Sequence, residues 1–341
     1  MIDLTRALYL GLAHGHAELA PWSALTTGRP SALDDAAGPL AAKLARLVGM
    51  PRGVLAPSTL HLVMDLYAAL PVDTIYLDPC AYAITQWGLE RAKLRGVEIL
   101  PLGCEVRPRS AIICDAVCVV CRRIAPLRSL HALARRSESW LVVDDSQGLG
   151  LLGDGPSRRT PYGHGGGGTL RWTSTPRDRV IVLGSCAKAF GVPVSFLAGA
   201  DKTIDWFERV SATRTHTSPC NAAELAALDV ALRRNADAGD ELRAHLLRNV
   251  QRFRREIALR GASLEAGRFP VQVSAPLPRR AARRLEATLA RRGVRALRLR
   301  ANRCENRLGF VITAAHETAA IDEAGAIVGD ALARGTACWS S

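Results

Sequence analysis

The sequence predicts an α/β protein built around a mostly parallel β-sheet. Short apolar runs alternate with stretches of helical periodicity through the middle of the chain. Several of these runs are apolar throughout, which is typical of parallel strands that are buried on both faces. The chain has 341 residues, which is enough for one large α/β domain and a smaller second domain.

The expected strands of the large sheet are separated by helical stretches, for example at 83–94 and 127–136. This βαβ order favours a sheet that is covered by helices on both faces. Glycine, proline and serine at 153–177 interrupt the order and predict a surface loop. The expected strands are 73–78, 97–100, 111–114, 140–144 and 180–184.

Beyond the sheet, a long amphipathic helix is expected to begin at Asn221 and to link the large domain to a smaller one. The smaller domain should contain strands at 269–273 and 308–312, with an arginine-rich helix between them. We therefore expect three regions, which are an N-terminal segment at 1–45, a large domain at 46–225 and a small C-terminal domain at 226–341.

The net charge is +13, from 45 lysines and arginines against 32 acidic residues. We interpret the excess as a solvated helix face, because no nucleic-acid-binding motif accompanies it. No apolar stretch is long enough to span a membrane, and no signal peptide is expected at the N-terminus. Much of the excess lies at Arg279, Arg280, Arg283, Arg284, Arg291 and Arg292.

Nine cysteines occur, and Cys118 and Cys121 form a single CxxC. They lie in a run that reads as a buried strand, where positions three apart point to opposite faces. A second pair at zinc spacing is absent from the sequence. We therefore expect reduced thiols in a cytoplasmic protein and no metal site.

Two strand ends carry residues suited to chemistry. Asp144 ends the apolar run WLVVD, where a carboxylate needs a partner or solvent. Lys188 follows the run VIVLG in a turn of small residues, and a desolvated lysine can form an imine with an aldehyde. Ser185 lies three residues before it and has a hydroxyl for a phosphate. The structural alternatives are a helix N-cap at Asp144 and an exposed turn lysine.

A third site is expected where a short strand ends at Ala56 and a helix begins near Ser58. The N–H groups of a helix N-terminus suit a phosphate, and Ser58 and Thr59 add hydroxyls. Plain N-capping is the alternative. Together, a phosphate-binding helix start, a strand-end aspartate and a later lysine predict a pyridoxal-phosphate (PLP) enzyme with its cofactor on Lys188 as a Schiff base.

The chain resembles the α-oxoamine synthases, a branch of the fold-type I PLP enzymes. The resemblance implies the aspartate aminotransferase-like fold, with a mostly parallel sheet in a large domain and a smaller C-terminal α+β domain. It extends over nearly the whole chain. The segments that carry it are YLGL at 9–12, VDDSQGLGLLG at 143–153, GSCAKAFG at 184–191, THTSP at 215–219 and RLGFVITAAHETAAID at 307–322.

The resemblance also implies roles for single residues. Lys188 would be the Schiff-base lysine and proton shuttle, and Asp144 would pair with the pyridinium. Tyr82 falls where the family has a histidine that stacks on the ring, with core packing as the alternative. Arg307 would bind the substrate carboxylate, with an exposed surface arginine as the alternative.

The phosphate would be held by Ser58, Thr59 and Ser185, with Thr217 or Ser218 contributed by a second subunit. A symmetric homodimer is therefore expected. The implied reaction condenses an amino acid with an acyl-CoA or acyl-carrier-protein thioester, and no nucleic acid or membrane partner is expected.

Two departures from the family pattern leave other reactions open. Gln147 replaces a histidine that contacts the cofactor's phenolic oxygen, and glutamine is not a general acid near neutral pH. Val119 stands where the family has a serine. The alternatives are an aminotransferase, racemase or decarboxylase with the same lysine and aspartate, and a noncatalytic protein of the same fold that binds through its basic surface.

Overall fold

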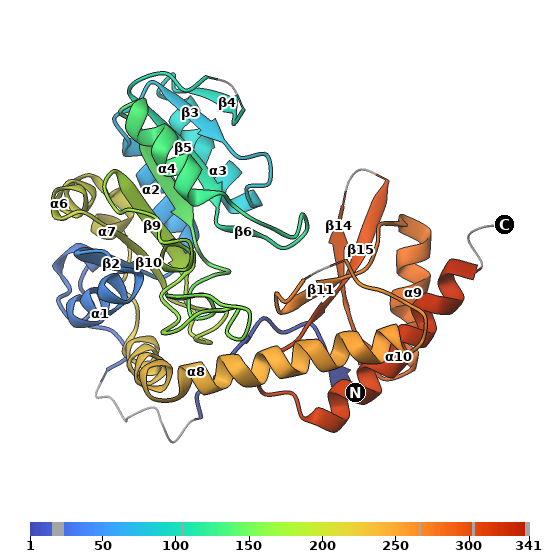
Figure 1. Cartoon of the computed structure of the whole chain (residues 1–341). Helices are drawn as coiled ribbons and strands as arrows, with labels where there is room; N and C mark the ends of the chain where they lie inside the picture. Colours follow the sequence, from blue (N-terminus) through green and yellow to red (C-terminus); the bar gives the residue numbers. More distant parts are fainter. Residues whose placement is uncertain (16–23, 104, 266, 302–303, 338–341) are drawn as a thin grey trace. The chain divides into compact units, whose positions relative to one another are not determined.

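The protein, seen in a computed structural model, divides into two compact units. The sheet unit contains residues 13–118 and 124–239, and the C-terminal unit contains residues 1–12, 119–123 and 240–341. Helix α8 (Ala222–Ala258) passes from the first unit into the second (Figure 1). The structure describes residues 1–15, 24–103, 105–265, 267–301 and 304–337.

The sheet unit is built on a seven-stranded sheet in the order β2–β10–β9–β8–β5–β3–β4 (Figure 1). Strand β10 runs antiparallel to both of its neighbours, and the other neighbouring strands are parallel. This confirms the mostly parallel sheet that the sequence predicts. The strands are β2 (Arg52–Ala56), β3 (Thr74–Leu77), β4 (Glu98–Pro101), β5 (Ser110–Asp115), β8 (Trp140–Asp144), β9 (Val180–Ser185) and β10 (Ser195–Gly199).

Helices α2, α3 and α6 share one apolar core with the sheet, and α1 and α4 contact it as well. Leu66 of α2 and Phe207 of α6 are fully buried in this core together with Ile113 of β5. Full burial of each such side chain contributes about 1.5–3 kcal/mol. The helices of this unit are η2 (Ser31–Leu33, 3-10), α1 (Gly38–Val48), α2 (Thr59–Ala69), α3 (Ala83–Lys93), α4 (Leu127–Arg136), α5 (Thr169–Trp172), α6 (Asp201–Val210) and α7 (Ala212–His216).

The surface loop expected at 153–177 is only partly correct. Residues 154–159 are exposed, but residues 166–170 are buried and lead into α5. The segment folds onto itself, because the Gly153 N–H donates to the Tyr162 carbonyl at 2.8 Å and a Cβ at Gly153 would collide with the carbonyl of His164. Its glycines therefore permit close backbone packing, which composition alone cannot distinguish from a solvated loop.

The C-terminal unit confirms the two expected strands and the arginine-rich helix α9 (Arg279–Arg291). Helix α10 (Thr318–Ala337) packs against α9. Strand β15 pairs antiparallel with β11, β12 and β14, and β1 pairs parallel with β13. These strands are β1 (Ile2–Asp3), β11 (Val271–Val273), β12 (Leu277–Pro278), β13 (Val294–Arg295), β14 (Leu297–Arg300) and β15 (Glu305–Val311).

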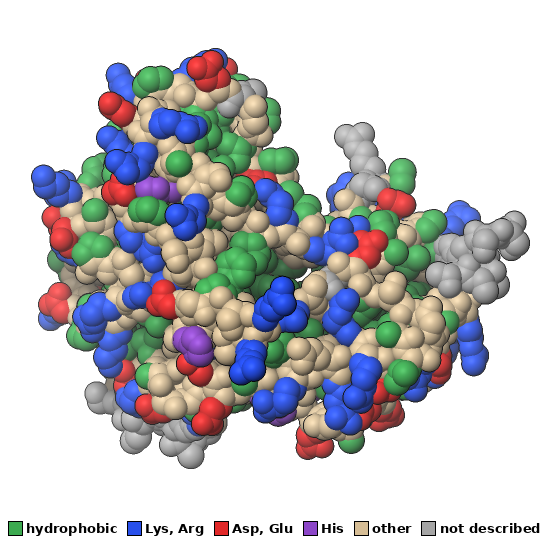
Figure 2. Space-filling model, in the orientation of Figure 1, with side chains coloured by type: hydrophobic (Ala, Val, Ile, Leu, Met, Phe, Trp, Pro, Cys, Tyr) green, Lys and Arg blue, Asp and Glu red, His purple; other side chains and the backbone are tan. Residues whose placement is uncertain are grey.

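The arginines of the α9 segment are exposed, as expected for a solvated helix face. Lysine and arginine side chains are scattered among acidic ones on the face shown in Figure 2. Within the described residues, no helix is both long enough and apolar enough to cross a membrane.

Candidate active site at the carboxyl edge of the sheet

Chemically active side chains gather where the central parallel strands end. Strands β5, β8 and β9 end at Asp115, Asp144 and Ser185, and Asp115 and Asp144 are register partners. Strand β10 begins at the same edge, because Ser195 is the register partner of both Ser185 and Ala56. This edge is where open α/β sheets bind ligands.

The Asp144 carboxylate is half-buried and fixed by the turn that follows β8. Its Oδ1 accepts a hydrogen bond from the Ser146 N–H at 2.9 Å. The Ser146 hydroxyl in turn accepts the Ser185 N–H at 2.9 Å, which ties the end of β9 to the same turn. Residues 146–148 form a turn and no helix begins there. The N-cap alternative for Asp144 is therefore wrong, and Gln147 lies half-buried in this turn.

Lys188 lies in the loop between β9 and β10 and is half-buried. Burial lowers the pKa of its amine, while the charges of Asp144 and Asp115 act in the opposite direction. The loop is held by the Cys186 N–H, which donates to the Val194 carbonyl at 2.7 Å. An amine with a lowered pKa loses its proton more readily, which is the state that attacks an aldehyde.

The start of α2 lies beside the start of β10. Ser58 caps the helix, accepting the His61 N–H at 3.4 Å, and its hydroxyl also contacts His61 Nδ1 at 2.7 Å. The Thr59 hydroxyl contacts the Ser195 hydroxyl at 2.9 Å. N-capping by Ser58 is therefore real, and the N–H groups of the first turn still face outward as anion donors.

Tyr82 is not a core residue, because 65% of its surface is exposed. It occupies the N-cap position of α3, and its N–H donates to Asp115 Oδ2 at 3.1 Å. Its ring is therefore available for stacking.

The sequence analysis missed Asp115. Burial and the neighbouring Asp144 charge raise the pKa of its carboxyl to about 8. Its Oδ1 is buried and has no hydrogen-bond partner in the described part of the chain. The run SAIICD carries the same signal as WLVVD, an apolar strand that ends in aspartate, and could have identified Asp115.

Asp145, next to Asp144, faces the interior and anchors the glycine-rich segment. Its two oxygens accept the Thr169 N–H and hydroxyl, each at 2.6 Å. Burial raises the pKa of Asp145 from 3.8 to about 7. The folded state therefore keeps a proton between these two values that the unfolded state has lost, so this group's contribution to stability falls as pH rises through that window.

Thr169→Val is expected to lower the free energy of unfolding by about 1 kcal/mol at pH 6 and about 2 kcal/mol at pH 8. The loss is larger at pH 8 because the ionised Asp145 then loses a charge-assisted bond. Urea unfolding at both pH values measures it. Thr288→Val, on the surface of α9, is the control, and an equal loss at the two pH values would contradict the assignment.

The remaining predicted residues are not joined to this edge by any hydrogen bond between described residues. The Thr217 hydroxyl donates to the Thr213 carbonyl at 2.7 Å, and Ser218 is exposed after α7. Arg307 belongs to the C-terminal unit, where its Nη1 contacts Glu265 and donates to the Ser274 carbonyl at 2.8 Å. Arg307 is half-buried, so the exposed surface alternative is wrong.

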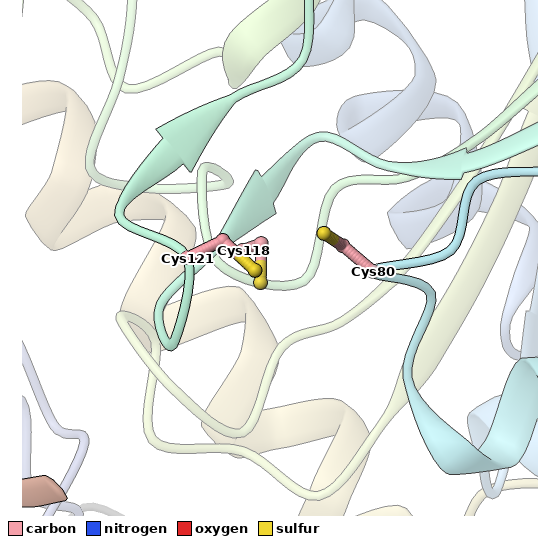
Figure 3. A group of neighbouring side chains, drawn as sticks. All are labelled: Cys80, Cys118 and Cys121. Atoms are coloured by element: carbon pink, nitrogen blue, oxygen red, sulfur yellow. The ribbon is translucent and has the colours of Figure 1, made fainter. Parts of the chain in front are cut away.

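The expectation that Cys118 and Cys121 lie on one strand and face opposite sides is wrong. Strand β5 ends at Asp115, and the chain then makes the short pair β6 (Val117–Cys118) and β7 (Arg123–Ile124). Cys118 and Cys121 lie side by side in this turn (Figure 3), with their Sγ atoms within 4.8 Å. The Sγ of Cys80 is equally close to that of Cys118. Such thiols suit a soft metal ion, so the absence of a metal stays a prediction.

The edge as a whole fits a cofactor that carries a cationic ring, an aldehyde and a phosphate. Asp144 supplies a fixed negative charge, and Lys188 supplies an amine with a lowered pKa. The first turn of α2 supplies anion donors beside Ser185. PLP has all three of these groups.

Comparison with known proteins agrees with this geometry. The sequence profile of the aminotransferase class I and II family matches residues 123–327. The 8-amino-7-oxononanoate synthase of Aromatoleum aromaticum is 34% identical over 168 residues, which are 48% of this chain and 40% of that protein. The enzyme of the same name from Dechloromonas aromatica is 29% identical over 278 residues, 73% of this chain and 68% of that protein. The match therefore spans less than two thirds of the first relative.

Solved structures show the same fold. Serine palmitoyltransferase of Sphingomonas wittichii superimposes with a TM-score of 0.83 at 18% identity, covering 98% of this chain and 88% of that one. For 8-amino-7-oxononanoate synthase of Francisella tularensis the TM-score is 0.77 at 18% identity, covering 96% of both chains. A serine palmitoyltransferase solved with PLP gives 0.83 at 16% identity, covering 97% and 87%. These matches confirm the expected fold-type I architecture.

Proposed function

The chain belongs to the aminotransferase class I and II family, and from this membership we propose that it is a PLP-dependent acyltransferase of the α-oxoamine synthase type. It would condense an amino acid with an acyl thioester. The observation that carries the proposal is the meeting of Asp144 and Lys188 at one edge of the sheet, with the amine pKa lowered by burial. The named sequence relatives support this branch of the family.

PLP supplies an aldehyde for the amine and, when its ring nitrogen is protonated, an electron sink for a carbanion at the substrate α-carbon. Asp144 would hold the proton on the ring nitrogen. Ser58, Thr59 and Ser185, with the first-turn N–H groups of α2, would bind the phosphate. Tyr82 would cover one face of the ring.

Lys188 would hold the cofactor and then work as a base. Its lowered pKa favours an unprotonated Nζ, which can accept the α-proton of the amino acid and later return it. Gln147 would orient the phenolic oxygen by hydrogen bonding. Arg307 would bind the substrate carboxylate through the face of its guanidinium that Glu265 does not occupy.

We extend the proposal to the assembly. A homodimer would let Thr217 or Ser218 of one chain reach the phosphate site of the other, which fits the absence of a hydrogen bond between described residues that ties them to their own edge. The cytoplasmic location that the cysteine pattern suggests remains a prediction.

Thiol release tests the reaction. The purified full chain with PLP, an amino acid and an acyl-CoA or acyl-carrier thioester is expected to release free thiol only when both substrates are present. A panel of amino acids and acyl lengths defines the pair. Thiol release that is independent of the amino acid, or none with any pair, would contradict acyl transfer.

Gln147 favours one alternative reaction, transamination, because a family histidine is missing there. In that case an amino donor alone would convert the bound cofactor to its pyridoxamine form. An absorbance change with donor alone and without thioester would therefore support an aminotransferase.

A further inference from the structure

We propose that Asp115 is a positioning residue of the cofactor site, which fixes the backbone at Tyr82 and stands beside Asp144 as a second carboxyl that is protonated at neutral pH. The inference rests on the proposed PLP site. The sequence analysis assigned it no role, and it follows from the sheet register and one backbone hydrogen bond.

Asp115 has a position that side-chain packing does not explain. It ends β5 in register with Asp144, so the two carboxyl groups leave neighbouring strands at the same edge. Its Oδ2 accepts the Tyr82 N–H at 3.1 Å. This bond sets where α3 begins and therefore where the exposed Tyr82 ring starts.

The charged and titratable groups around Asp115 come from every neighbouring element. They are Asp144 on β8, Asp78 after β3, Tyr67 on α2 and Lys188 after β9. Burial raises the pKa of Asp115 most, the charges of Asp144 and Asp78 add to the rise, and the Tyr82 N–H and Lys188 oppose it, with a result of about 8. Two such close carboxylates cannot both ionise easily beside a single amine.

The geometry also locates the proton. Oδ2 already accepts the Tyr82 N–H, whereas Oδ1 is buried and has no partner among the described residues. The proton therefore belongs on Oδ1, where the neutral acid becomes a hydrogen-bond donor. Below pH 8 the edge then presents one negative charge, that of Asp144, and a second appears only above it.

Two substitutions separate these features. Asp115→Asn keeps an oxygen for the Tyr82 N–H and places an NH₂ donor at the Oδ1 position, so it imitates the neutral acid. Asp115→Ala removes both groups. At pH 7 we expect the Asn variant to bind PLP within about threefold of the wild type, and the Ala variant to bind at least about tenfold more weakly, the equivalent of one lost hydrogen bond.

Cofactor absorbance followed from pH 6 to pH 9.5 gives the decisive readout. The wild type is expected to show a component near pH 8, which Asp115→Asn lacks. A purely structural role would leave this component unchanged in the Asn variant. The proposal is overturned if the component persists, or if Asp115→Asn loses as much PLP affinity as Asp115→Ala.

A measurement on the cofactor-free chain separates this inference from the proposed function. Ionised Asp115 raises the pKa of Lys188, so above pH 8 Lys188 of the wild type should be acylated more slowly by acetic anhydride than Lys188 of Asp115→Asn, with equal rates at pH 7. If PLP never attaches to Lys188 but this difference appears, the proposed function fails and the charge relation stands. Equal rates at both pH values overturn the relation itself.

Discussion

Lys188→Ala is expected to abolish covalent retention of PLP and to lower kcat at least about a thousandfold. The residue supplies both the amine that holds the aldehyde and the base for the α-proton, and a positioned base alone contributes about 10²–10⁴ in rate. Borohydride treatment of the wild type should fix PLP to the peptide that contains Lys188, as mass spectrometry can show. The variant should remain unlabelled at every other lysine.

The fold should survive this change. Lys188 is half-buried, and burial lowers the pKa of its amine, so removing it relieves a desolvation cost. The surrounding loop depends on backbone hydrogen bonds such as that from Cys186 to Val194. We expect the free energy of unfolding of the cofactor-free protein to change by no more than about 1 kcal/mol.

Lys202→Ala is the matched control, because Lys202 is an exposed lysine on α6. It should keep full labelling and turnover. Lys188→Arg keeps the positive charge but cannot form the link, so it should be as inactive as the alanine variant. Turnover by either Lys188 variant above about one per cent of wild type would show that another group carries the chemistry.

The strands that hold the site could be predicted because their physics is local. Parallel strands buried on both faces read as continuous apolar runs, and strand β8 and helix α4 have the bounds that the sequence predicts. A polar residue that ends such a run stands out against it, as Asp144 does. The carboxyl-edge position then follows from the βαβ order.

Features that depend on tertiary contacts were not predicted. Strand β10 is short and its antiparallel pairing has no local signal. The run that contains Cys118 kinks after Asp115 and forms a hairpin, although it is apolar enough for a strand. The role of Asp115 depends on its register with Asp144, which no single segment encodes.

Asp144→Asn is expected to lower kcat at least about a hundredfold with little change in fold. The amide keeps the oxygen that accepts the Ser146 N–H, so the turn after β8 should persist. What is lost is the charge opposite the ring nitrogen, and leaving one member of a buried charge pair without its partner costs about 3–5 kcal/mol. The proton on the ring, and with it the electron sink, should then be lost at neutral pH.

Two neighbouring groups should report the same loss of charge. The Asp144 carboxylate raises the pKa of both Asp115 and Lys188, so Asp144→Asn should lower both. The absorbance component near pH 8 should therefore move to lower pH, and Lys188 of the cofactor-free chain should react with acetic anhydride at lower pH than in the wild type. Asp73→Asn, at the opposite edge of the sheet just before β3, is the control and should change neither. If Asp144→Asn leaves kcat and both titrations as in the wild type, the negative charge at the end of β8 has no part in the chemistry, and the cofactor must be oriented in some other way.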